Sequence, residues 1–213
     1  HGAVIDHYGG SDTRVFCEVT EVGAALEQLQ EVNGSQNPAE AAVIYDVENR
    51  WAVEDAAGPR NAGVFYKETV EKPYQAFRKL GINVDVIDET CSLDGYRVVA
   101  APMVYLLREG WTEKVRNFVK NGGIFLLTYW SGIVDETDLC YLGGTPHDLM
   151  DVMGFRSMEI DGLYDGEWNE GIPEPENPLH LERAYRCSHL CELVQPSTAE
   201  VVMTYGKDFY DGM

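Results

Sequence analysis

The sequence predicts an α/β protein built on a doubly wound, mostly parallel β-sheet. Three observations support this fold class. Short apolar segments alternate with amphipathic helical segments, glycines stand where predicted helices give way to strands, and the apolar fraction of 45% suits an ordinary globular core. Strand–helix–strand alternation favours parallel strands with helices on both faces of the sheet. At 213 residues the chain has room for one sizeable domain and an appendage.

The first predicted element is an amphipathic helix over residues 12–31, with Ser11 or Asp12 as its N-cap. Its apolar side chains are spaced alternately four and three residues apart, at Val15, Val19, Val22, Leu26 and Leu29. So short a heptad pattern favours a helix packed on its own protein over a coiled coil. The polar segment 33–38 then ends the helix. The N-terminal segment is therefore expected to form a separate unit that needs a surface to lie against.

From residue 41 onward the pattern changes to alternating strands and helices. The predicted elements are a strand at 41–46, a loop at 48–61, a helix at 65–80, strands at 83–88 and within 96–107, a helix at 112–123, a strand directly after it, a helix at 146–154, a loop at 162–178 and a strand at 199–206.

The helix predicted at 65–80 has one apolar face and ends at Gly81. Pro73 lies inside this helix and is expected to remove a hydrogen bond and to kink it. The face consists of Val70, Tyr74, Phe77 and Leu80.

The charge balance excludes two classes of partner. The chain carries 16 basic and 36 acidic residues, a net charge of −20, which repels nucleic acid and anionic membrane surfaces. No apolar run is long enough to span a bilayer, and no signal peptide is present. Segment 133–182 holds 13 of the acidic residues and only one basic residue, Arg156. A solvated acidic loop region explains this best, and a metal site or a basic partner is the alternative.

The five cysteines are odd in number and form no Cys-x-x-Cys pair, which favours free thiols in a reducing compartment, hence a cytoplasmic location. The tightest cluster is Cys187-Ser188-His189-Leu190-Cys191. A structural zinc ion would need a fourth ligand and, usually, paired short spacings. Ordinary thiols on a helix or strand are therefore preferred there, and we expect no metal and no cofactor.

The carboxyl ends of the predicted strands are where ligands and catalytic groups gather in such folds. Asp46 and Glu48 follow the first strand, and they suit acid/base chemistry or cation binding in principle. The simpler interpretation is that one of them hydrogen-bonds the loop while the other is solvated. Polar or bulky side chains follow the next strands, at Asp88, Glu89, Met103, Tyr105 and the segment 129–131.

No catalytic motif is found among these residues. Ser131 would need glycines two residues to either side to form a nucleophile elbow, and Tyr129 and Ile133 stand there instead. No cysteine follows a strand at such an elbow, and no glycine-rich phosphate loop is present. The pair Asn169-Glu170 serves as an acid/base motif in many retaining glycosidases, but here it lies in an acidic loop and is interpreted as a coincidence. Bulky side chains fill the active-site edge of the sheet.

Long segments of the chain resemble family 42 glycoside hydrolases, the bacterial β-galactosidases. The resemblance runs over nearly the whole chain. It is carried by "HGAVIDHYGGSDTRVFCEVTEVGAALEQL", "AAVIYDVENRWAVEDAAGP", "LGINVDVID", "YRVVAAPMVYLL", "FVKNGGIFLLTYWSGIVDETDLCYLGG" and "AEVVMTYGKDFY".

The resemblance implies a domain organisation. Residues 1–37 resemble the C-terminal end of a (β/α)₈ catalytic barrel, including its last helix. Residues 38–213 resemble a trimerisation domain with a class I glutamine amidotransferase-like, flavodoxin-like, three-layer sandwich, cut before its final strand. The chain starts at His1 and stops soon after a predicted strand, so we expect it to be part of a longer protein. The apolar stripe of the first helix is expected to be exposed here, because its partner in the barrel is missing.

The resemblance also implies a function. The catalytic glutamates of the family belong to barrel strands upstream of residue 1, so none can be assigned here, and the galactoside substrate would bind the missing barrel. The leading hypothesis is a non-catalytic oligomerisation domain of a homotrimeric, retaining β-galactosidase. The alternatives are an amidotransferase-like activity, or a galactoside-binding module that uses the strand-end cleft near Trp130.

The predicted subunit interface follows from aromatic and acidic residues beyond that cleft. Large aromatic side chains dominate the energetics of interfaces, and charge there must be offset by a neighbour or by solvent. A solvent-exposed acidic loop with Trp130 in the core is the alternative interpretation. The predicted interface residues are Trp130, Asp135, Glu136, Tyr141 and Trp168.

Overall fold

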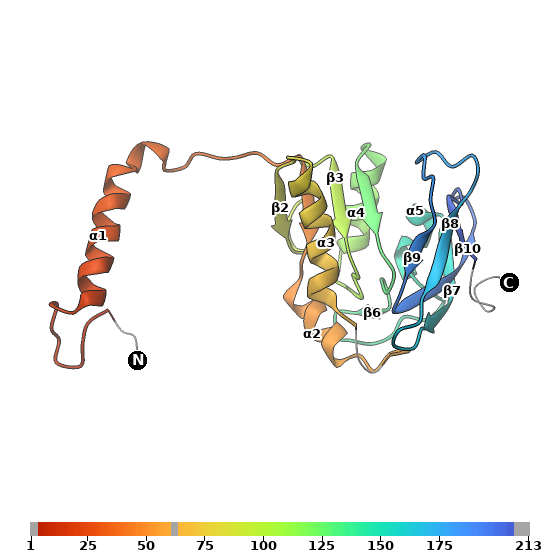
Figure 1. Ribbon diagram of the computed structural model, residues 1–213, viewed down its shortest axis with the longest axis horizontal. Helices are drawn as coiled ribbons and strands as arrows, with labels where there is room; N and C mark the ends of the chain where they lie inside the picture. Colours follow the sequence, from red (N-terminus) through yellow and green to blue (C-terminus); the bar gives the residue numbers. More distant parts are fainter. Residues whose placement is uncertain (1–3, 61–63, 207–213) are drawn as a thin grey trace. The chain divides into compact units, whose positions relative to one another are not determined.

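The computed structural model of the chain describes residues 4–60 and 64–206 (Figure 1). Its internal contacts divide it into two compact units, His1–Pro38 and Ala39–Met213. Each unit is described by itself below. Within the described residues no helix is both long and apolar enough to cross a membrane.

The N-terminal unit consists of helix α1, Arg14–Gln28, and a short 3₁₀ helix, η1, Gln30–Val32. Thr13 caps α1 by accepting the N–H of Phe16 at 3.1 Å, so the predicted caps at residues 11 and 12 are wrong. A threonine hydroxyl reaches the third helical N–H from the Ncap position, and the two earlier residues lie too far upstream to do so.

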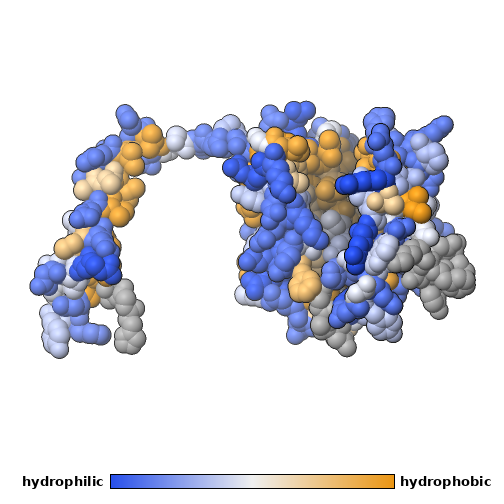
Figure 2. Space-filling model, viewed as in Figure 1, coloured by the Kyte–Doolittle hydropathy of each residue, from blue (hydrophilic) through white to orange (hydrophobic). Residues whose placement is uncertain are grey.

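The predicted exposure of the apolar stripe on α1 is confirmed. No residue of this helix is buried, and Figure 2 shows apolar residues running along it. Val15 is half-buried, while the other members of the stripe keep 49–62% of their surface exposed, namely Val19, Val22, Leu26 and Leu29. The N-terminal unit therefore presents an apolar face that it does not cover itself.

The C-terminal unit is built around a four-stranded sheet of order β2-β1-β3-β5, in which every pair is parallel. The prediction of a parallel α/β sheet is confirmed. Ala42 of β1 pairs with Asp85 of β2 and Val99 of β3, and Val99 pairs with Phe125 of β5. The strands are β1 (Ala41–Ile44), β2 (Val84–Ile87), β3 (Val98–Ala101) and β5 (Ile124–Leu127).

Helices cover both faces of this sheet, as the alternation of strands and helices predicts. Val43 and Ala100 pack with residues of α2, Val47–Asp55, and α3, Tyr66–Lys79, in one core cluster. Their strand neighbours point the other way and pack with residues of α4, Trp111–Lys120, in a second cluster. Side chains of a strand alternate between faces, so both faces of the central strands are buried.

Helix α2 corrects the predicted loop at 48–61. Its apolar residues Ala52 and Val53 make only a short buried face, so the sequence shows little helical periodicity there. The start signal is Asp46, whose side chain accepts the N–H groups of Glu48 and Asn49.

Helix α3 runs without a break from residue 66 to residue 79 with Pro73 inside it. Gly81 follows the C-cap with φ +73°, which confirms the predicted glycine end. Val70 of the predicted apolar face is buried, whereas Leu80 of the same face is 74% exposed, because the last turn of α3 extends past the residues that pack on the sheet.

The remaining elements form smaller sheets. Strands β4, Leu106–Leu107, and β6, Val134–Asp135, form a short parallel pair. The predicted helix at 146–154 is a 3₁₀ turn followed by a short helix. The other elements are η2 (His147–Leu149), α5 (Met150–Met153), β7 (Phe155–Gly162) paired with β10 (Leu190–Pro196), and β8 (Asn169–Pro173) between β9 (Tyr185–Cys187) and β11 (Met203–Tyr205).

Strand β8 corrects the predicted loop at 162–178. Asn169 and Gly171 are buried while the residues between and after them are partly exposed, the alternation of a half-buried strand. Glycine, proline and acidic residues hide this pattern in the sequence, because those residue types are depleted in strands generally.

Candidate functional site at the strand ends and the 133–144 loop

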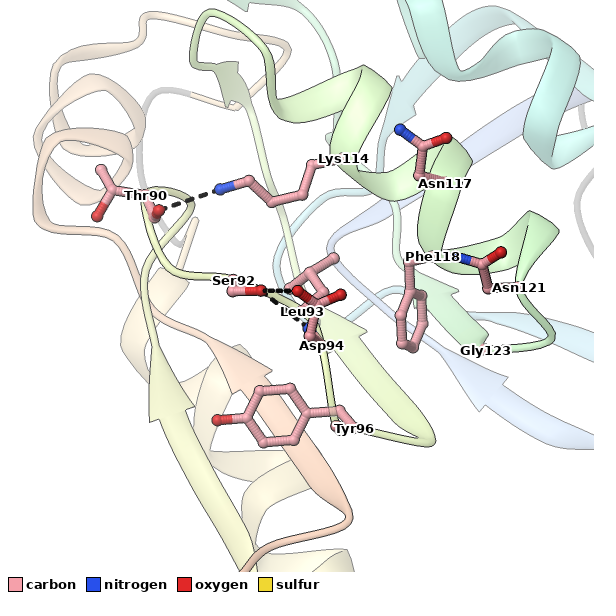
Figure 3. A pocket seen from close by; sticks show the side chains of 11 residues that line it. Thr90, Ser92, Leu93, Asp94, Tyr96, Lys114, Asn117, Phe118, Asn121 and Gly123 are labelled. Atoms are coloured by element: carbon pink, nitrogen blue, oxygen red, sulfur yellow. Dashed lines mark hydrogen bonds between the residues drawn. The ribbon is translucent and has the colours of Figure 1, made fainter.

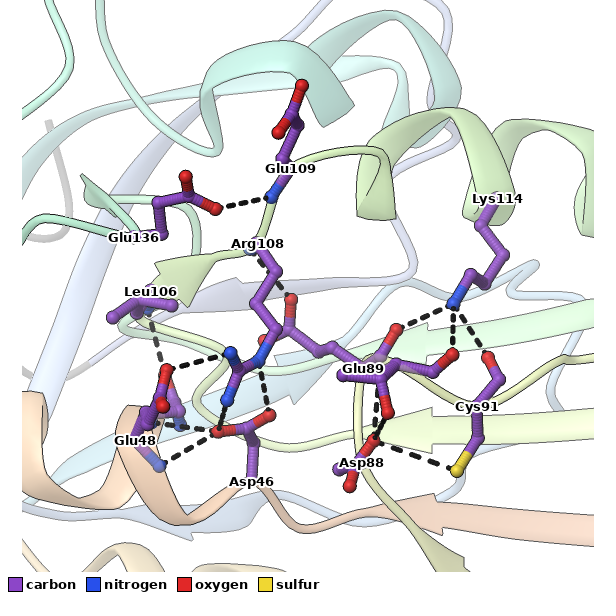
Figure 4. Close-up of polar contacts among 12 residues, drawn as sticks. Asp46, Glu48, Asp88, Glu89, Cys91, Leu106, Arg108, Glu109, Lys114 and Glu136 are labelled. Atoms are coloured by element: carbon purple, nitrogen blue, oxygen red, sulfur yellow. Dashed lines mark hydrogen bonds and ion pairs between the residues drawn. The ribbon is translucent and has the colours of Figure 1, made fainter.

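The carboxyl ends of β1, β2, β3 and β5 meet at one edge of the sheet, where folds of this kind bind ligands. Asp46 follows β1, Glu89 follows β2, Met103 follows β3 and Trp130 follows β5. Figure 4 shows the first two of these side chains converging on Arg108, which follows β4. The polar residues at this edge are called the strand-end cluster, and its members are Asp46, Glu48, Asn49, Glu89 and Arg108.

Asp46 is the centre of the strand-end cluster. Its side chain is 1% exposed and forms a two-pronged ion pair with Arg108, with Nε–Oδ2 at 2.8 Å and Nη2–Oδ1 at 2.9 Å. Burial on its own raises the pKa of Asp46. The hydrogen bonds from Arg108 and from the N–H groups of Asn49 and Glu48 outweigh burial, so the pKa lies below its usual value. Asp46 is therefore an ionised helix cap with its own counter-ion.

Glu48 lies on the solvent side of the same guanidinium, with Oε2 2.7 Å from Nη1 of Arg108 and about half of the side chain exposed. The sequence predicted that one of the two carboxylates bonds the following segment while the other is solvated. Asp46 is the one that bonds this segment, which is the start of α2 rather than a loop, and Glu48 is the half-exposed one. Arg108 was not predicted as their partner. Arg108 therefore binds both carboxylates, one buried and one half-exposed.

Asn49 closes the crevice from the first turn of α2. Its side chain is fully buried, donates from Nδ2 to the carbonyl of Met103 at 2.9 Å, and accepts the N–H of Leu106 at 2.8 Å. Met103 has φ +46°, and its N–H donates to the hydroxyl of Thr128 at 2.8 Å. A protein amide thus uses the polar backbone groups that a bound ligand would otherwise meet in this crevice.

Glu89 is the most isolated carboxyl group of the strand-end cluster. It is 2% exposed, Oε2 accepts the N–H of Arg108 at 3.0 Å, and Oε1 has no hydrogen-bond partner. Burial raises the pKa of Glu89 to about 8. Lys114 lies close by, but its Nζ donates to three backbone carbonyls, those of Glu89, Thr90 and Cys91, at 2.7–3.1 Å.

The turn after β5 is filled by Trp130. This residue has φ +59°, is 4% exposed, and stacks on Tyr105 with ring centroids 5.6 Å apart. The backbone N–H of Trp130 donates to Oε1 of Glu192 at 2.7 Å. Gly58 lies against the indole ring, and a Cβ at Gly58 would overlap it. Trp130 therefore lies in the core, as the alternative interpretation expected.

Ser131 is a structural hydroxyl. Its Oγ accepts the N–H of Val104 at 3.1 Å and donates to the carbonyl of Thr128 at 2.9 Å. The first bond holds the turn after β5 against the segment after β3, and the second closes that turn on itself. A hydroxyl whose proton is already donated to a carbonyl lacks the adjacent base that activates a nucleophile.

The 133–144 loop contains β6 and carries three of the predicted interface residues. Asp135 folds the loop on itself by accepting from the N–H and hydroxyl of Thr137 at 2.8 and 2.7 Å. Glu136 accepts the N–H of Glu109 at 3.2 Å. Tyr141 is half-buried and stacks on His147 with ring centroids 3.7 Å apart.

Apolar side chains lie on the same loop among its acids. Leu139 is 66% exposed and Leu142 is 92% exposed. Trp168, the remaining predicted interface residue, is half-buried, and the guanidinium of Arg186 lies 5.3 Å from its ring centroid. Four of the five predicted interface residues thus reach the surface of this chain, and the fifth, Trp130, does not.

A separate surface pocket of about 580 Å³ lies between the segment 90–96 and α4 (Figure 3). Its charged groups are already engaged. Asp94 accepts the hydroxyl of Ser92 at 2.8 Å, and Lys114 donates to the carbonyls named above. Among the residues that the structure describes, no three histidine, cysteine or acidic side chains gather where they could hold a metal ion.

Several residues of the site were missed from the sequence, although signals for them exist. Arg108 is a lone basic residue directly after an apolar segment, and Glu192 interrupts an apolar strand. A charged residue in an apolar context often has a specific partner. Asn49 and Leu142 carry no signal of this kind in a single sequence.

The protein family described as β-galactosidase trimerisation domain matches residues 39–213 of the chain. A β-galactosidase of Alicyclobacillus acidocaldarius is 51% identical to the chain over 213 residues, which are all of this chain and 31% of that protein. A β-galactosidase of Clostridium perfringens is 48% identical with the same coverage. The chain thus spans about a third of the length of these curated relatives.

Solved structures give the same result. The β-galactosidase of Rahnella sp. R3 superposes with a TM-score of 0.83 at 50% identity, covering all of this chain and 31% of that one. A β-galactosidase of glycoside hydrolase family 42 from G. stearothermophilus has a TM-score of 0.78 at 39% identity, covering 99% of this chain and 30% of that one.

Proposed function

The chain belongs to the family of β-galactosidase trimerisation domains of glycoside hydrolase family 42, and we propose that residues 39–213 join three copies of a longer β-galactosidase. The family match over this whole segment is the observation that carries the proposal. The filled strand-end crevice is consistent with it, because a domain that only assembles subunits needs no open ligand site there. Neither the family nor these relatives support the amidotransferase-like or sugar-binding alternatives.

The parent protein is proposed to be a homotrimeric enzyme that hydrolyses terminal β-D-galactosides with retention. Support comes from the relatives, which are β-galactosidases about three times as long as this chain. The catalytic carboxylates and the galactoside site are assigned to the part of the parent outside residues 1–213, and no catalytic residue, metal or cofactor is assigned within them. The net charge of −20 argues against nucleic acid or membrane partners. The odd number of cysteines and the lack of a Cys-x-x-Cys pair favour a cytoplasmic enzyme.

The sheet is proposed to be of the class I glutamine amidotransferase-like type, a flavodoxin-like three-layer sandwich. The strand order β2-β1-β3-β5 with helices on both faces supports this assignment. So does the left-handed backbone of Trp130 at the end of β5. Enzymes of that class hold a cysteine nucleophile on a tight turn at about this point, and here a buried tryptophan occupies the turn.

Residues 1–37 are proposed to be the C-terminal end of the catalytic barrel. They form part of a unit separate from the trimerisation domain. The exposed apolar stripe of α1 supports the proposal, because an amphipathic helix normally buries such a stripe against a partner. The trimerisation domain is proposed to continue beyond residue 213.

The subunit interface is proposed to include the 133–144 loop and Trp168, with Asp135, Glu136 and Tyr141 among its contacts. The exposed Leu142 and Leu139 add apolar anchors to this surface. Trp130 is proposed to support the surface from below, because its indole ring packs on Tyr105 and presents almost no area to a neighbour.

The experiment is sedimentation of the full-length parent carrying Leu142→Glu. A charged residue in a desolvated apolar anchor should weaken the trimer by a factor of at least about a hundred. The matched control is Leu80→Glu on α3, because Leu80 is similarly exposed and lies outside the proposed interface. A trimer equally weakened by both substitutions, or by neither, would contradict the interface. A wild-type parent that is monomeric would contradict the function itself.

A further inference from the structure

Glu89 is a buried carboxyl group that the trimerisation function leaves unexplained. It follows β2, is 2% exposed and leaves Oε1 without a hydrogen-bond partner. An orphaned buried polar atom normally lowers the stability of a protein, because no hydrogen bond offsets its loss of water. The titratable and charged groups that face Glu89 come from every element around it, namely Asp46, Tyr66, Arg108, Lys114 and Tyr141.

These neighbours give Glu89 no counter-ion of its own. The guanidinium of Arg108 is held by both carboxylate oxygens of Asp46, and Lys114 is held by three backbone carbonyls. The negative charge of Asp46 raises the pKa of Glu89 further. The Arg108 N–H and the charges of Arg108 and Lys114 lower this pKa, but by less than burial raises it. Burial is the main reason that the pKa of Glu89 is raised to about 8, so its carboxyl favours the protonated form at pH 7.

Glu89 also holds the segment that reaches the 133–144 loop. Its Oε2 accepts the N–H of Arg108, and the next residue, Glu109, donates its N–H to Glu136. Figure 4 shows the side chains of Glu89 and Glu136 on opposite sides of the segment 108–109. The segment continues from β4, which pairs with β6 at the base of the loop. Release of the Glu89 contact would therefore loosen the support of the loop.

We propose that Glu89 is a proton-dependent latch on residues 106–109. With its carboxyl protonated, Glu89 closes this segment onto the carboxyl ends of β1 and β2. When the segment opens, water reaches the carboxyl, which releases one proton to solvent and stays ionised. The consequence for assembly rests on the proposed function: the 133–144 loop holds its shape best while Glu89 carries a proton.

The direction of the pH dependence follows from the two pKa values of this group. The closed state binds the proton up to about pH 8, whereas a solvated glutamate loses it near its model value of 4.5. Between these values the closed state holds one more proton than the open state, so opening becomes about tenfold easier per pH unit. The stabilisation of the closed state by the latch is fully present below the pKa of the open state, 4.5. It falls as pH rises and stays constant once pH exceeds the pKa of the closed state, about 8.

Hydrogen exchange of the Arg108 amide in the full 213-residue chain tests the latch. After correction for the intrinsic exchange rate, its protection should fall about tenfold per pH unit from about pH 5 to 8 and then level off. Glu89→Gln keeps the side-chain shape and cannot ionise, so the protection of the Arg108 amide should no longer depend on pH in this variant. The matched control is Glu192→Gln, because Glu192 is another carboxyl whose burial raises its pKa but whose partner is the Trp130 N–H.

Carboxyl NMR of the wild-type chain provides a readout that needs no variant. A Glu89 titration midpoint near 8 supports the latch, and a midpoint near 4.5 overturns it. An Arg108 slope that persists in Glu89→Gln, or that disappears in Glu192→Gln, also overturns it. Sedimentation of the parent at pH 6 tests the proposed function separately. A monomeric parent at this pH would contradict trimerisation, and the hydrogen-exchange and NMR results would still test the latch.

Discussion

At the residue scale, the side chains at the strand-end edge contact one another and the backbone, and so occupy groups that a ligand could otherwise bind. Asp46 supplies a charge and Arg108 neutralises it, Asn49 uses the backbone polar groups, and Trp130 fills the volume beside them. Every one of these groups contacts residues far away in the sequence. The edge is therefore a rigid junction between strands, which suits a domain that must present a fixed surface to other subunits.

Trp130→Ala should destabilise the chain by about 3–5 kcal/mol, because it removes a nearly fully buried indole and leaves a cavity beside Tyr105 and Gly58. Urea unfolding of the 213-residue chain measures this change. Trp168→Ala is the control, and since Trp168 is only half-buried its cost should be clearly smaller. Equal losses for the two substitutions would show that Trp130 is not a core residue.

Arg108→Leu should destabilise the chain by about 3–5 kcal/mol, because it leaves the carboxylate of Asp46 buried and without its cation. Adding Asp46→Asn should recover part of this loss, since the double variant buries no unpaired charge. Arg14→Leu breaks a largely exposed ion pair with Glu18 and should cost less than about 1 kcal/mol. If Arg108→Leu costs no more than Arg14→Leu in urea unfolding, the ion pair with Asp46 is not a structural anchor.

At the element scale, the sequence predicted the helices and strands whose apolar residues follow a local helical or strand period. The parallel strands and α4 follow from short apolar runs and from glycine ends, so they were located within a few residues. Helix α2 was missed because its buried face is only two or three residues wide. Strand β8 was missed because its partners, β9 and β11, stabilise it from distant parts of the chain and its own composition is unfavourable for a strand.

In the strand-end cluster, too, the sequence predicted what depends on neighbouring residues and not what depends on distant ones. Asp46 was identified from its position after the first strand, and its role in the loop was anticipated. Its counter-ion was not, because Arg108 lies 62 residues away and the pair forms only where the start of α2 meets the end of β4. The absence of a nucleophile elbow at Ser131 could be predicted, since that motif is local. The burial of Trp130 could not, because it depends on Tyr105 and Gly58 in other segments.

The exposed stripe of α1 gives the element-scale prediction. In the 213-residue chain, the double variant Val22→Glu and Leu26→Glu should change the unfolding free energy of the C-terminal unit by less than about 0.5 kcal/mol, because both side chains are already more than half exposed. In the full-length parent the same variant should lower the thermal midpoint by several degrees, because the stripe is proposed to pack on the catalytic barrel.

Ala24→Glu provides the matched control for that experiment. Ala24 lies on the opposite face of α1 from the stripe, so the same glutamate should be tolerated in both proteins. A parent that tolerates the double variant as well as it tolerates Ala24→Glu would contradict the assignment of residues 1–37 to the barrel.

At the scale of the whole molecule, assembly and catalysis are assigned to different parts of the parent enzyme. Retaining hydrolysis of a glycoside needs two carboxyl groups about 5 Å apart that flank the scissile bond. In the strand-end cluster the acidic residues are paired with Arg108 or buried and neutral, which is unsuited to that chemistry. The net charge of −20 also means that three copies can meet only where apolar anchors and neighbouring cations offset the repulsion.

The purified 213-residue chain should therefore release no detectable aglycone from an aryl β-galactoside. The full-length parent, assayed at the same molar concentration, is the positive control. Release by the chain that disappears when Glu89, Glu170 or another of its own acids is replaced by the corresponding amide would contradict the assignment of catalysis outside residues 1–213.

The native mass of the full-length parent tests the central claim most directly. Sedimentation equilibrium or native mass spectrometry at micromolar concentration should give the mass of three chains, because residues 39–213 belong to a trimerisation family and their strand-end edge is filled rather than open. A parent enzyme that is active and has the mass of one chain under the same conditions would contradict the account.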